Sequence, residues 1–224
     1  MISNISHYID NTMLSPVATF RDVEQFCYES KKLGCKAVFV NSSFLPISKK
    51  VLNNSDTKIG CSIGFPLGSS STSIKVLETE KCLEYDPDEV DMQMHLGAFL
   101  SNDYYYIKKE IDAILETIRK KSNNIILKVI IESCYLTNSQ IKQASLLISD
   151  TGADFIKTSS GFAKHGATLE AVRQIKKAVG NNIKIKASGG IKSYSDAINF
   201  IESGADRIGT SNGKLIINQH NKII

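Results

Sequence analysis

Short runs rich in valine and isoleucine recur along the whole chain, and segments with a helical spacing of apolar residues separate them. Near-continuous hydrophobicity, rather than strict alternation with polar residues, is typical of parallel strands that are covered on both faces. Seven runs have this character, and a weaker run with polar residues at its centre precedes them. The expected strands are 8–14, 37–41, 58–64, 89–97, 125–133, 154–160, 183–189 and 206–211.

The segments between these runs repeat apolar residues every three or four positions, as an amphipathic helix does. Such stripes cover 23–33, 107–118 and 172–179, and a further helix is expected to begin at Ser193 or Tyr194. Thr168 and Gly180 are suitable caps for the two ends of the third stripe. Strands that alternate with helices, without any linker, predict an α/β protein in which residues 1–224 form a single-domain TIM (β/α)8 barrel.

A doubly wound open sheet is the alternative way to arrange alternating strands and helices. That fold binds dinucleotides through a G-x-G-x-x-G turn after its first strand, and no such turn follows the first expected strands of this chain. The barrel is therefore the preferred prediction.

The composition excludes several classes of protein. Hydrophobic residues make up 42% of the chain and charged residues 22%, which is ordinary for a globular domain and not for a disordered one. The net charge is only +4 and the lysines are scattered, so we expect no binding to nucleic acid or to a membrane surface. The start of the chain lacks the features of a signal peptide, and the five cysteines form no CxxC pair. These features favour reduced thiols and a cytoplasmic location.

Three consecutive expected strands carry a lysine near their carboxyl-terminal half: Lys128, Lys157 and Lys186. An ammonium group inside a barrel must be paired or deprotonated, because its desolvation is costly. One such lysine is explained by a side chain that extends to the barrel mouth, but three on neighbouring strands indicate a site. Barrel enzymes place their chemistry at this end of the strands.

A carboxylate accompanies these lysines, since Asp91 lies on the preceding strand with Gln93 and His95 at the same parity. Burial and a second ammonium group both lower the pKa of a lysine, and a free amine attacks carbonyl groups to form a Schiff base. Asp91 would then transfer protons. Spacing alone does not decide which lysine is the nucleophile. Spacing does not separate Lys186 from Lys184 either, because both have the same parity. Lys184 lies nearer the start of the strand, so Lys186, beside Ser188, Gly189 and Gly190, is preferred.

Glycines end the last two expected strands, in the sequences ASGG and GTSNG. Glycine turns at the ends of strands seven and eight, followed by helix starts, suit a backbone cradle for a phosphate group. Gly161 and the loop 162–168 extend over the same end, with Lys164 as a possible cation. The four histidines lack metal-ligand spacing, so we expect no metal.

Several segments, in this order and spacing, resemble the deoxyribose-phosphate aldolase family. They are IDNTML, CSIGFPLG, DEVDM, LKVIIES, GADFIKTSSGF, IKASGGI and RIGTS, and they span about residues 8–211. The resemblance implies a class I aldolase on a TIM barrel, with no metal and no organic cofactor. Its reaction would be the reversible cleavage of 2-deoxy-D-ribose 5-phosphate into D-glyceraldehyde 3-phosphate and acetaldehyde.

The resemblance also implies a role for individual residues. Lys157 would be the Schiff-base nucleophile, Lys186 would lower its pKa and carry protons, and Asp91 would be the acid/base partner. Lys128 would lie near the substrate hydroxyls, with Thr158 and Ser188 as neighbours of the pocket. The phosphate would be held by Gly189, Gly190, Gly209 and Ser211.

Some positions depart from the usual pattern of the family and bear on rate and specificity: Asn11, Ser15, Gln93, His95 and Asn212. The family-level expectation for partners is a sugar phosphate and acetaldehyde, in a homodimer or other homo-oligomer. Two other functions are compatible with the residues. One is a Schiff-base lyase or transaldolase for a different sugar phosphate, and the other is a catalytically silent phosphate-binding barrel. The interior charges argue against the silent barrel, which has no use for them.

Overall fold

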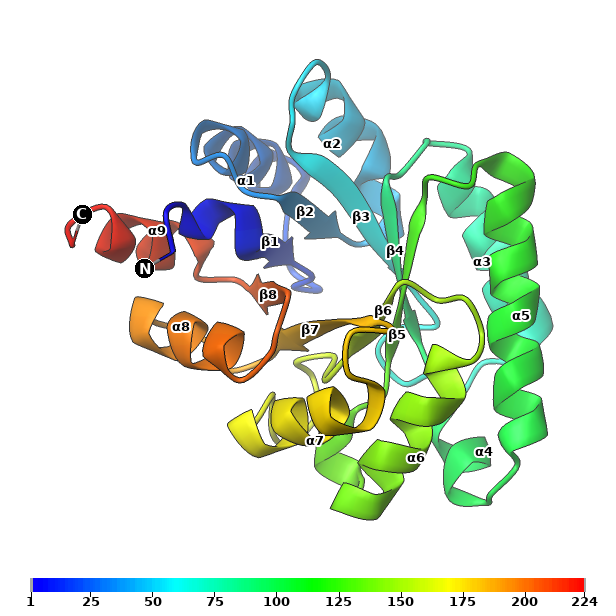
Figure 1. The fold of residues 1–224 in the computed structure, drawn as a ribbon. Helices are drawn as coiled ribbons and strands as arrows, with labels where there is room; N and C mark the ends of the chain where they lie inside the picture. Colours follow the sequence, from blue (N-terminus) through cyan, green and yellow to red (C-terminus); the bar gives the residue numbers. More distant parts are fainter. Residues whose placement is uncertain (1, 224) are drawn as a thin grey trace.

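Eight parallel strands close into a barrel in the order of the chain, with β1 paired to both β2 and β8 (Figure 1). The computed structural model describes residues 2–223. The strands are β1 (Ile9–Met13), β2 (Ala37–Val40), β3 (Lys58–Ile63), β4 (Glu89–Gln93), β5 (Ile126–Ile130), β6 (Phe155–Lys157), β7 (Lys184–Ser188) and β8 (Arg207–Thr210). The predicted TIM barrel is confirmed, including the weak first strand.

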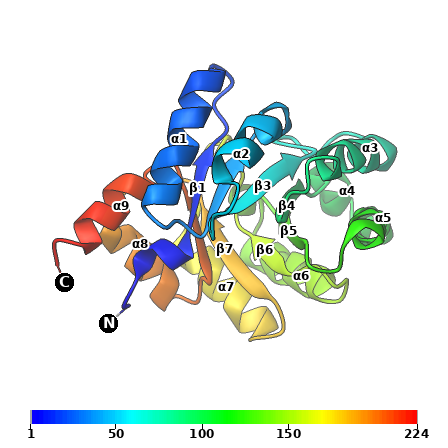
Figure 2. The ribbon, with the colours of Figure 1, turned by 90° about the horizontal axis from the view of Figure 1, so that it is seen from above.

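Helices surround the strands, as the view from above shows (Figure 2). They are α1 (Phe20–Lys32), α2 (Leu45–Leu52), α3 (Thr72–Leu83), α4 (Leu96–Leu100), α5 (Tyr104–Lys121), α6 (Asn138–Ser149), α7 (Leu169–Val179), α8 (Tyr194–Glu202) and α9 (Gly213–His220). Three short 3-10 helices, η1 (Ile5–Tyr8), η2 (Ser42–Phe44) and η3 (Ser133–Tyr135), complete the elements. The Thr168 side chain caps α7 and Gly180 ends it, as predicted.

Three strands end earlier than expected, since β5 ends at Ile130 rather than at 133, β6 at Lys157 rather than at 160, and β4 shows the largest difference. The fourth strand was expected over 89–97, but β4 ends at Gln93 and α4 begins three residues later. The His95 side chain accepts a hydrogen bond from the Ala98 backbone N–H at 3.1 Å, which caps this short helix. A local side-chain cap therefore ends the strand, although its apolar pattern continues.

Side chains alternate along each strand, so they form two buried regions: a layer between the strands and the helices, and the inside of the barrel. Outward-facing residues such as Val38, Val90 and Ile156 pack against the helices in one continuous apolar core. The inward-facing residues include aromatic rings, Phe39 and Phe155, and buried charged groups. The apolar layer between barrel and helices therefore holds the fold, while the charges are gathered inside the barrel.

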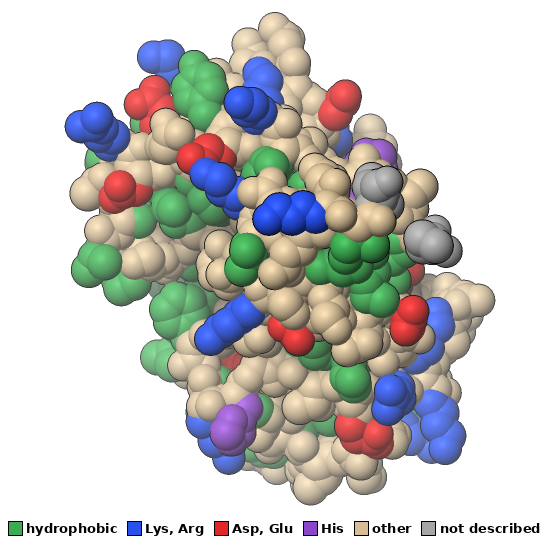
Figure 3. All heavy atoms as spheres, turned by 90° about the vertical axis from the view of Figure 1, so that its left-hand side faces the viewer, with side chains coloured by type: hydrophobic (Ala, Val, Ile, Leu, Met, Phe, Trp, Pro, Cys, Tyr) green, Lys and Arg blue, Asp and Glu red, His purple; other side chains and the backbone are tan. Residues whose placement is uncertain are grey.

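The surface carries charges of both signs. On the side of α1, α8 and α9, basic and acidic side chains are interspersed (Figure 3), in agreement with the small net charge. Among residues 2–223, no helix has both the length and the apolar character that a membrane crossing requires.

Candidate active site

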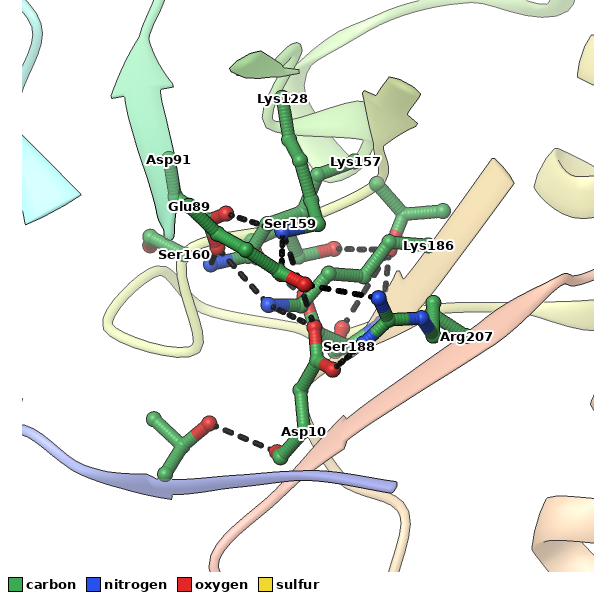
Figure 4. Close-up of polar contacts among 12 residues, drawn as sticks. Asp10, Glu89, Asp91, Lys128, Lys157, Ser159, Ser160, Lys186, Ser188 and Arg207 are labelled. Carbon is green, nitrogen blue, oxygen red and sulfur yellow. Dashed lines mark hydrogen bonds and ion pairs between the residues drawn. The ribbon is translucent and has the colours of Figure 1, made fainter. Parts of the chain in front are cut away.

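Three inward-facing residues from three strands meet at one carboxylate oxygen. The Nζ atoms of Lys157 on β6 and Lys186 on β7 each donate to Oδ2 of Asp91 on β4, both at 2.8 Å (Figure 4). Lys157 and Lys186 are also direct partners in the register of β6 and β7. The exposed fraction is 3% for Lys157, 1% for Lys186 and 0% for Asp91, so all three groups are desolvated.

A network of buried ions lies directly beneath this trio. Lys186 also contacts Asp10 at 2.7 Å, and Lys128 lies 3.4 Å from Asp91 and against Glu89. Arg207 contacts Glu89 at 2.8 Å and is paired with Asp10 as well. This ion network around Asp91 therefore holds four basic groups and three carboxylates. The basic groups are Lys128, Lys157, Lys186 and Arg207, and the carboxylates are Asp10, Glu89 and Asp91.

This excess of one positive charge is consistent with the pKa of Lys157, which is lowered to about 8. Burial is the main cause, and the ammonium groups of Lys186 and Lys128 add to it against the opposing effect of Asp91. Burial by itself would raise the pKa of Asp91, but the three surrounding lysines hold it well below its usual value. Near neutral pH, Asp91 is therefore ionised and an appreciable fraction of Lys157 is a free amine.

Lys128 lies deeper than the sequence suggested. It is the register partner of Asp91 and of Phe155, whereas Lys157 pairs with Ile130, two residues further along β5. Lys128 is fully buried in mid-strand, and the carboxylates around it raise its pKa above the usual value, although burial opposes this. Its ammonium group supports Asp91 from below, and the expectation that it lies near the substrate hydroxyls stays a prediction.

A cavity of about 460 Å³ opens above Lys157, at the carboxyl ends of β1, β6, β7 and β8. Of the seven residues that the resemblance implies for substrate binding, five line it: Ser188, Gly189, Gly190, Gly209 and Ser211. Thr158 does not belong to this lining. Its buried side chain accepts from the Ser188 N–H at 3.1 Å and ties β6 to β7.

Two glycines in this lining need their lack of a side chain. Gly189 and Gly190 have φ angles of +88° and +80°, which other residues rarely adopt. The backbone of Gly189 also packs against Gly166 in the loop after β6, where a β-carbon on Gly166 would collide with the Gly189 carbonyl oxygen. The loop after β6 and the turn after β7 thus form one wall of the cavity.

Sequence reasoning missed several residues of the site. Asp10, Glu89 and Arg207 were not singled out, although Glu89 shares the parity of Asp91 and Asp10 lies in the quoted IDNTML segment. Lys192, in the loop after Gly190, lines the cavity and supplies a cation there. Lys164, which was considered for that purpose, instead lies over the Tyr135 ring at 5.5 Å.

Within residues 2–223, no group of three or more His, Cys, Asp or Glu side chains is arranged to hold a metal ion. At the cavity, the Lys157 amine lies beside the Asp91 carboxylate and the Lys186 ammonium group.

A buried amine of lowered pKa beside a carboxylate, open to a cavity at the carboxyl end of a parallel barrel, defines an enzyme that works on carbonyl compounds as class I aldolases do. Comparison with known families agrees with this class. The chain belongs to the DeoC/LacD family of aldolases, whose family model matches residues 5–219. The resemblance seen in the sequence is confirmed.

Individual relatives are similar over nearly the full chain. The deoxyribose-phosphate aldolase of Carboxydothermus hydrogenoformans is 42% identical over 215 residues, which cover 96% of this chain and 94% of that protein. The deoxyribose-phosphate aldolase of Thermococcus gammatolerans is 43% identical over 216 residues, covering 96% and 95%.

Solved structures are similar in the same way. An aldolase named QR15 superposes with a TM-score of 0.93 at 40% identity, covering 99% of this chain and 97% of its own. The deoxyribose phosphate aldolase of Aeropyrum pernix, described as a unique tetrameric structure, gives 0.89 at 27% identity, covering 98% and 92%.

Proposed function

We propose that this chain reversibly cleaves 2-deoxy-D-ribose 5-phosphate into D-glyceraldehyde 3-phosphate and acetaldehyde, in the catabolism of deoxyribose phosphates. The observation that carries the proposal is the Lys157 amine, which has a pKa of about 8, donates to Asp91 and lines the cavity. The names of the relatives support the choice of substrate.

In this mechanism the neutral Lys157 amine attacks C1 of the open-chain sugar phosphate. Loss of water from the carbinolamine gives an iminium ion, which draws electrons from the bond between C2 and C3. Asp91, directly or through a water molecule, accepts the proton of the C3 hydroxyl as that bond breaks, and C3 leaves as the aldehyde carbon of glyceraldehyde 3-phosphate. The enamine that remains is protonated at C2, and hydrolysis releases acetaldehyde and the free amine.

Lys186 has two functions in this proposal. Its ammonium group shares Oδ2 of Asp91 with Lys157, so it opposes protonation of Lys157 through like-charge repulsion. It is also connected to Asp91 by a hydrogen bond, and a proton can therefore pass between the two groups during imine formation and hydrolysis.

The phosphate end of the substrate would lie between the ends of β7 and β8. Gly189, Gly190, Gly209, Ser211 and Lys192 line that part of the cavity. Backbone N–H groups, a hydroxyl and a lysine are the groups that bind phosphate in proteins. This arrangement separates the charged phosphate from the Schiff-base chemistry at the other end.

We further propose that the whole chain acts as one domain and that the enzyme is a cytoplasmic homo-oligomer. The closed barrel formed by residues 2–223 supports the first statement. The tetramer described for the Aeropyrum pernix relative supports an oligomer, and sedimentation of the purified protein tests it.

Borohydride trapping with acetaldehyde, read by peptide mass spectrometry, tests the nucleophile, the donor and the chemistry together. The expected result is a two-carbon adduct on Lys157, with turnover reduced about 10,000-fold or more in Lys157→Ala. Lys184→Ala is a matched control, because Lys184 is an exposed lysine at the start of β7. An adduct on Lys186 would exchange the two roles.

Two further results would contradict the proposed reaction. A folded protein without any adduct would indicate a silent phosphate-binding barrel. Failure to add acetaldehyde to glyceraldehyde 3-phosphate, with trapping of another carbonyl compound, would indicate a different sugar-phosphate lyase or a transaldolase.

A further inference from the structure

Glu132, two residues beyond the end of β5, adopts an unusual backbone conformation. Its φ and ψ angles are +49° and +62°, in the left-handed region that a residue with a long side chain rarely occupies. Such a conformation is unfavourable and persists where the surroundings enforce it, most often at functional sites. Glu132 is also only 3% exposed, and burial raises the pKa of its carboxyl group.

The carboxyl group of Glu132 reaches across to the loop after β6. Its two oxygens lie 3.2 and 3.1 Å from the backbone nitrogen of Ser160, which donates to them. A second bond joins the same segments, because the Ser133 N–H donates to the Thr158 carbonyl at 2.8 Å. The left-handed turn at Glu132 precedes η3 and turns the chain away from the direction of β5. The chain after β5 therefore runs beside the loop after β6.

The residues that follow this contact form part of the cavity wall. Ser160, Gly161 and Phe162 line the cavity, and the Phe162 N–H donates to the Ser160 hydroxyl at 3.1 Å. On the other side, the Ser188 hydroxyl donates to the Ser159 carbonyl at 2.6 Å. The wall 159–162 is therefore held between the end of β5 and the end of β7.

We propose that Glu132 is a positioning residue that fixes the wall 159–162 and thereby makes the enzyme selective for phosphorylated substrates. This inference rests on the proposed function, in which the neighbouring residues Gly189, Gly190 and Ser211 hold the phosphate. Without the Glu132 contact, the β7 side alone would hold the wall and the phosphate end of the cavity would widen. Lys157 lies within β6, before this loop, so widening of the phosphate end would leave its position unchanged. The charge of Glu132 also acts on Lys157, but its loss would affect both substrates alike, so the preference for the phosphorylated substrate reports the positioning role.

The test compares 2-deoxy-D-ribose 5-phosphate with unphosphorylated 2-deoxy-D-ribose in steady-state kinetics. Glu132→Ala removes the acceptor, Glu132→Asp keeps the charge on a shorter side chain, and Glu132→Gly removes the acceptor while relieving the backbone strain. We expect each variant to lose about 10-fold or more in kcat/KM for the phosphorylated substrate, mostly through KM, because one hydrogen bond to a charged group is lost. The unphosphorylated substrate should change by less than about 3-fold.

Two controls separate positioning from general stability. Glu132→Gln keeps a side-chain oxygen that accepts from Ser160 and should retain the preference for phosphate. Glu78→Asp is the second control. The Glu78 carboxylate also accepts from a backbone N–H, that of Gly64 after β3, at 2.7 Å. The same shortening there should leave the preference for the phosphorylated substrate unchanged. Thermal unfolding of every variant checks that a kinetic change is not caused by loss of fold.

Three results would overturn the inference. Equal losses for both substrates would mean that Glu132 acts on the amine chemistry or on the fold as a whole. Unchanged kinetics for both would mean that the wall stays in place without Glu132. Recovery of the phosphate preference in Glu132→Gly, but not in Glu132→Ala, would mean that backbone strain rather than the hydrogen bond is responsible. If the wild-type protein itself fails to cleave 2-deoxy-D-ribose 5-phosphate, the proposed function fails instead.

Discussion

Lys157 and Lys186 face each other across the β6–β7 ladder and donate to the same oxygen of Asp91 at the same distance, 2.8 Å. One carboxylate oxygen cannot neutralise two ammonium groups in a desolvated interior. Lys157 is the group open to the cavity, and its pKa is lowered to about 8. The pair therefore prepares an amine at the place where a carbonyl carbon can reach it.

Replacing Lys186 by leucine should raise the pKa of Lys157, because it removes the nearest positive charge. The free amine is the reactive form, so the rising limb of the pH profile of kcat/KM should move from about 8 to higher pH. Activity should also fall by about 100-fold or more, since a proton carrier is lost. An unchanged profile would contradict the like-charge explanation, and Lys184→Leu serves as the control.

Asp91→Asn should move the rising limb of the pH profile of kcat/KM to lower pH. The carboxylate raises the pKa of Lys157, so a neutral amide of the same shape leaves burial and the other lysines to lower it further. Turnover should nevertheless fall about 100-fold to 10,000-fold, because the acceptor for the hydroxyl proton is gone. A limb that shifts to higher pH would show that Asp91 controls Lys157 in some other way.

Lys157→Met should make the folded protein more stable near pH 7. The pKa of Lys157 is about 8 in the folded state against 10.5 for an ordinary lysine, so folding disfavours the charged form. The unfolded chain binds more protons between these two values, and the free energy of unfolding of the wild type should therefore rise as pH increases from about 8 to about 10.5.

The methionine variant lacks this slope and should gain on the order of 1–3 kcal/mol at pH 7, an amount set by the shift in pKa. Urea unfolding at pH 7 and at pH 10 measures both effects. Equal stability of wild type and variant at pH 7, or a difference between them that does not shrink from pH 7 to pH 10, would be inconsistent with a depressed pKa. The comparison with the variant is needed because buried cysteines also titrate over this range.

Gly166→Ala should weaken binding of the phosphate end. The added methyl group would meet the backbone oxygen of Gly189, which cannot move away as a flexible side chain would. We expect KM for 2-deoxy-D-ribose 5-phosphate to rise about 10-fold with a smaller change in kcat. Gly97→Ala in α4 is the control for the substitution itself, because a β-carbon there meets only the His95 ring, at 3.4 and 3.6 Å, which is ordinary van der Waals contact. A Gly166→Ala enzyme with unchanged KM would mean that the wall adjusts at no cost.

The sequence predicted the strand positions well and the strand ends less well. Hydrophobic runs marked all eight strands, because a parallel strand buried on both faces is recognisable from its own residues. The end of β4 was missed, because the His95 cap competes with an apolar pattern that continues past it. The depth of Lys128 was also missed, since it depends on the register of β5 against its neighbours.

The sequence by itself determined the class of fold and the residues that violate its rules. Period and composition are local properties, and a lysine in an apolar strand is visible without any neighbour. It could not determine which charges meet. Arg207 and Asp10 are 197 positions apart and become paired only when the barrel closes β8 against β1.

Tertiary structure alone decided the chemistry of Lys157, because the charges that surround it come from strands that are distant in the sequence. Its pKa depends on burial and on charges contributed by β4, β5 and β7, and each contribution depends on strand register. The left-handed turn at Glu132 likewise has meaning only beside the Ser160 N–H, which lies 28 positions away in the chain. Electrostatic energy in a protein interior depends on distance in space and on desolvation, and neither is a property of a single segment.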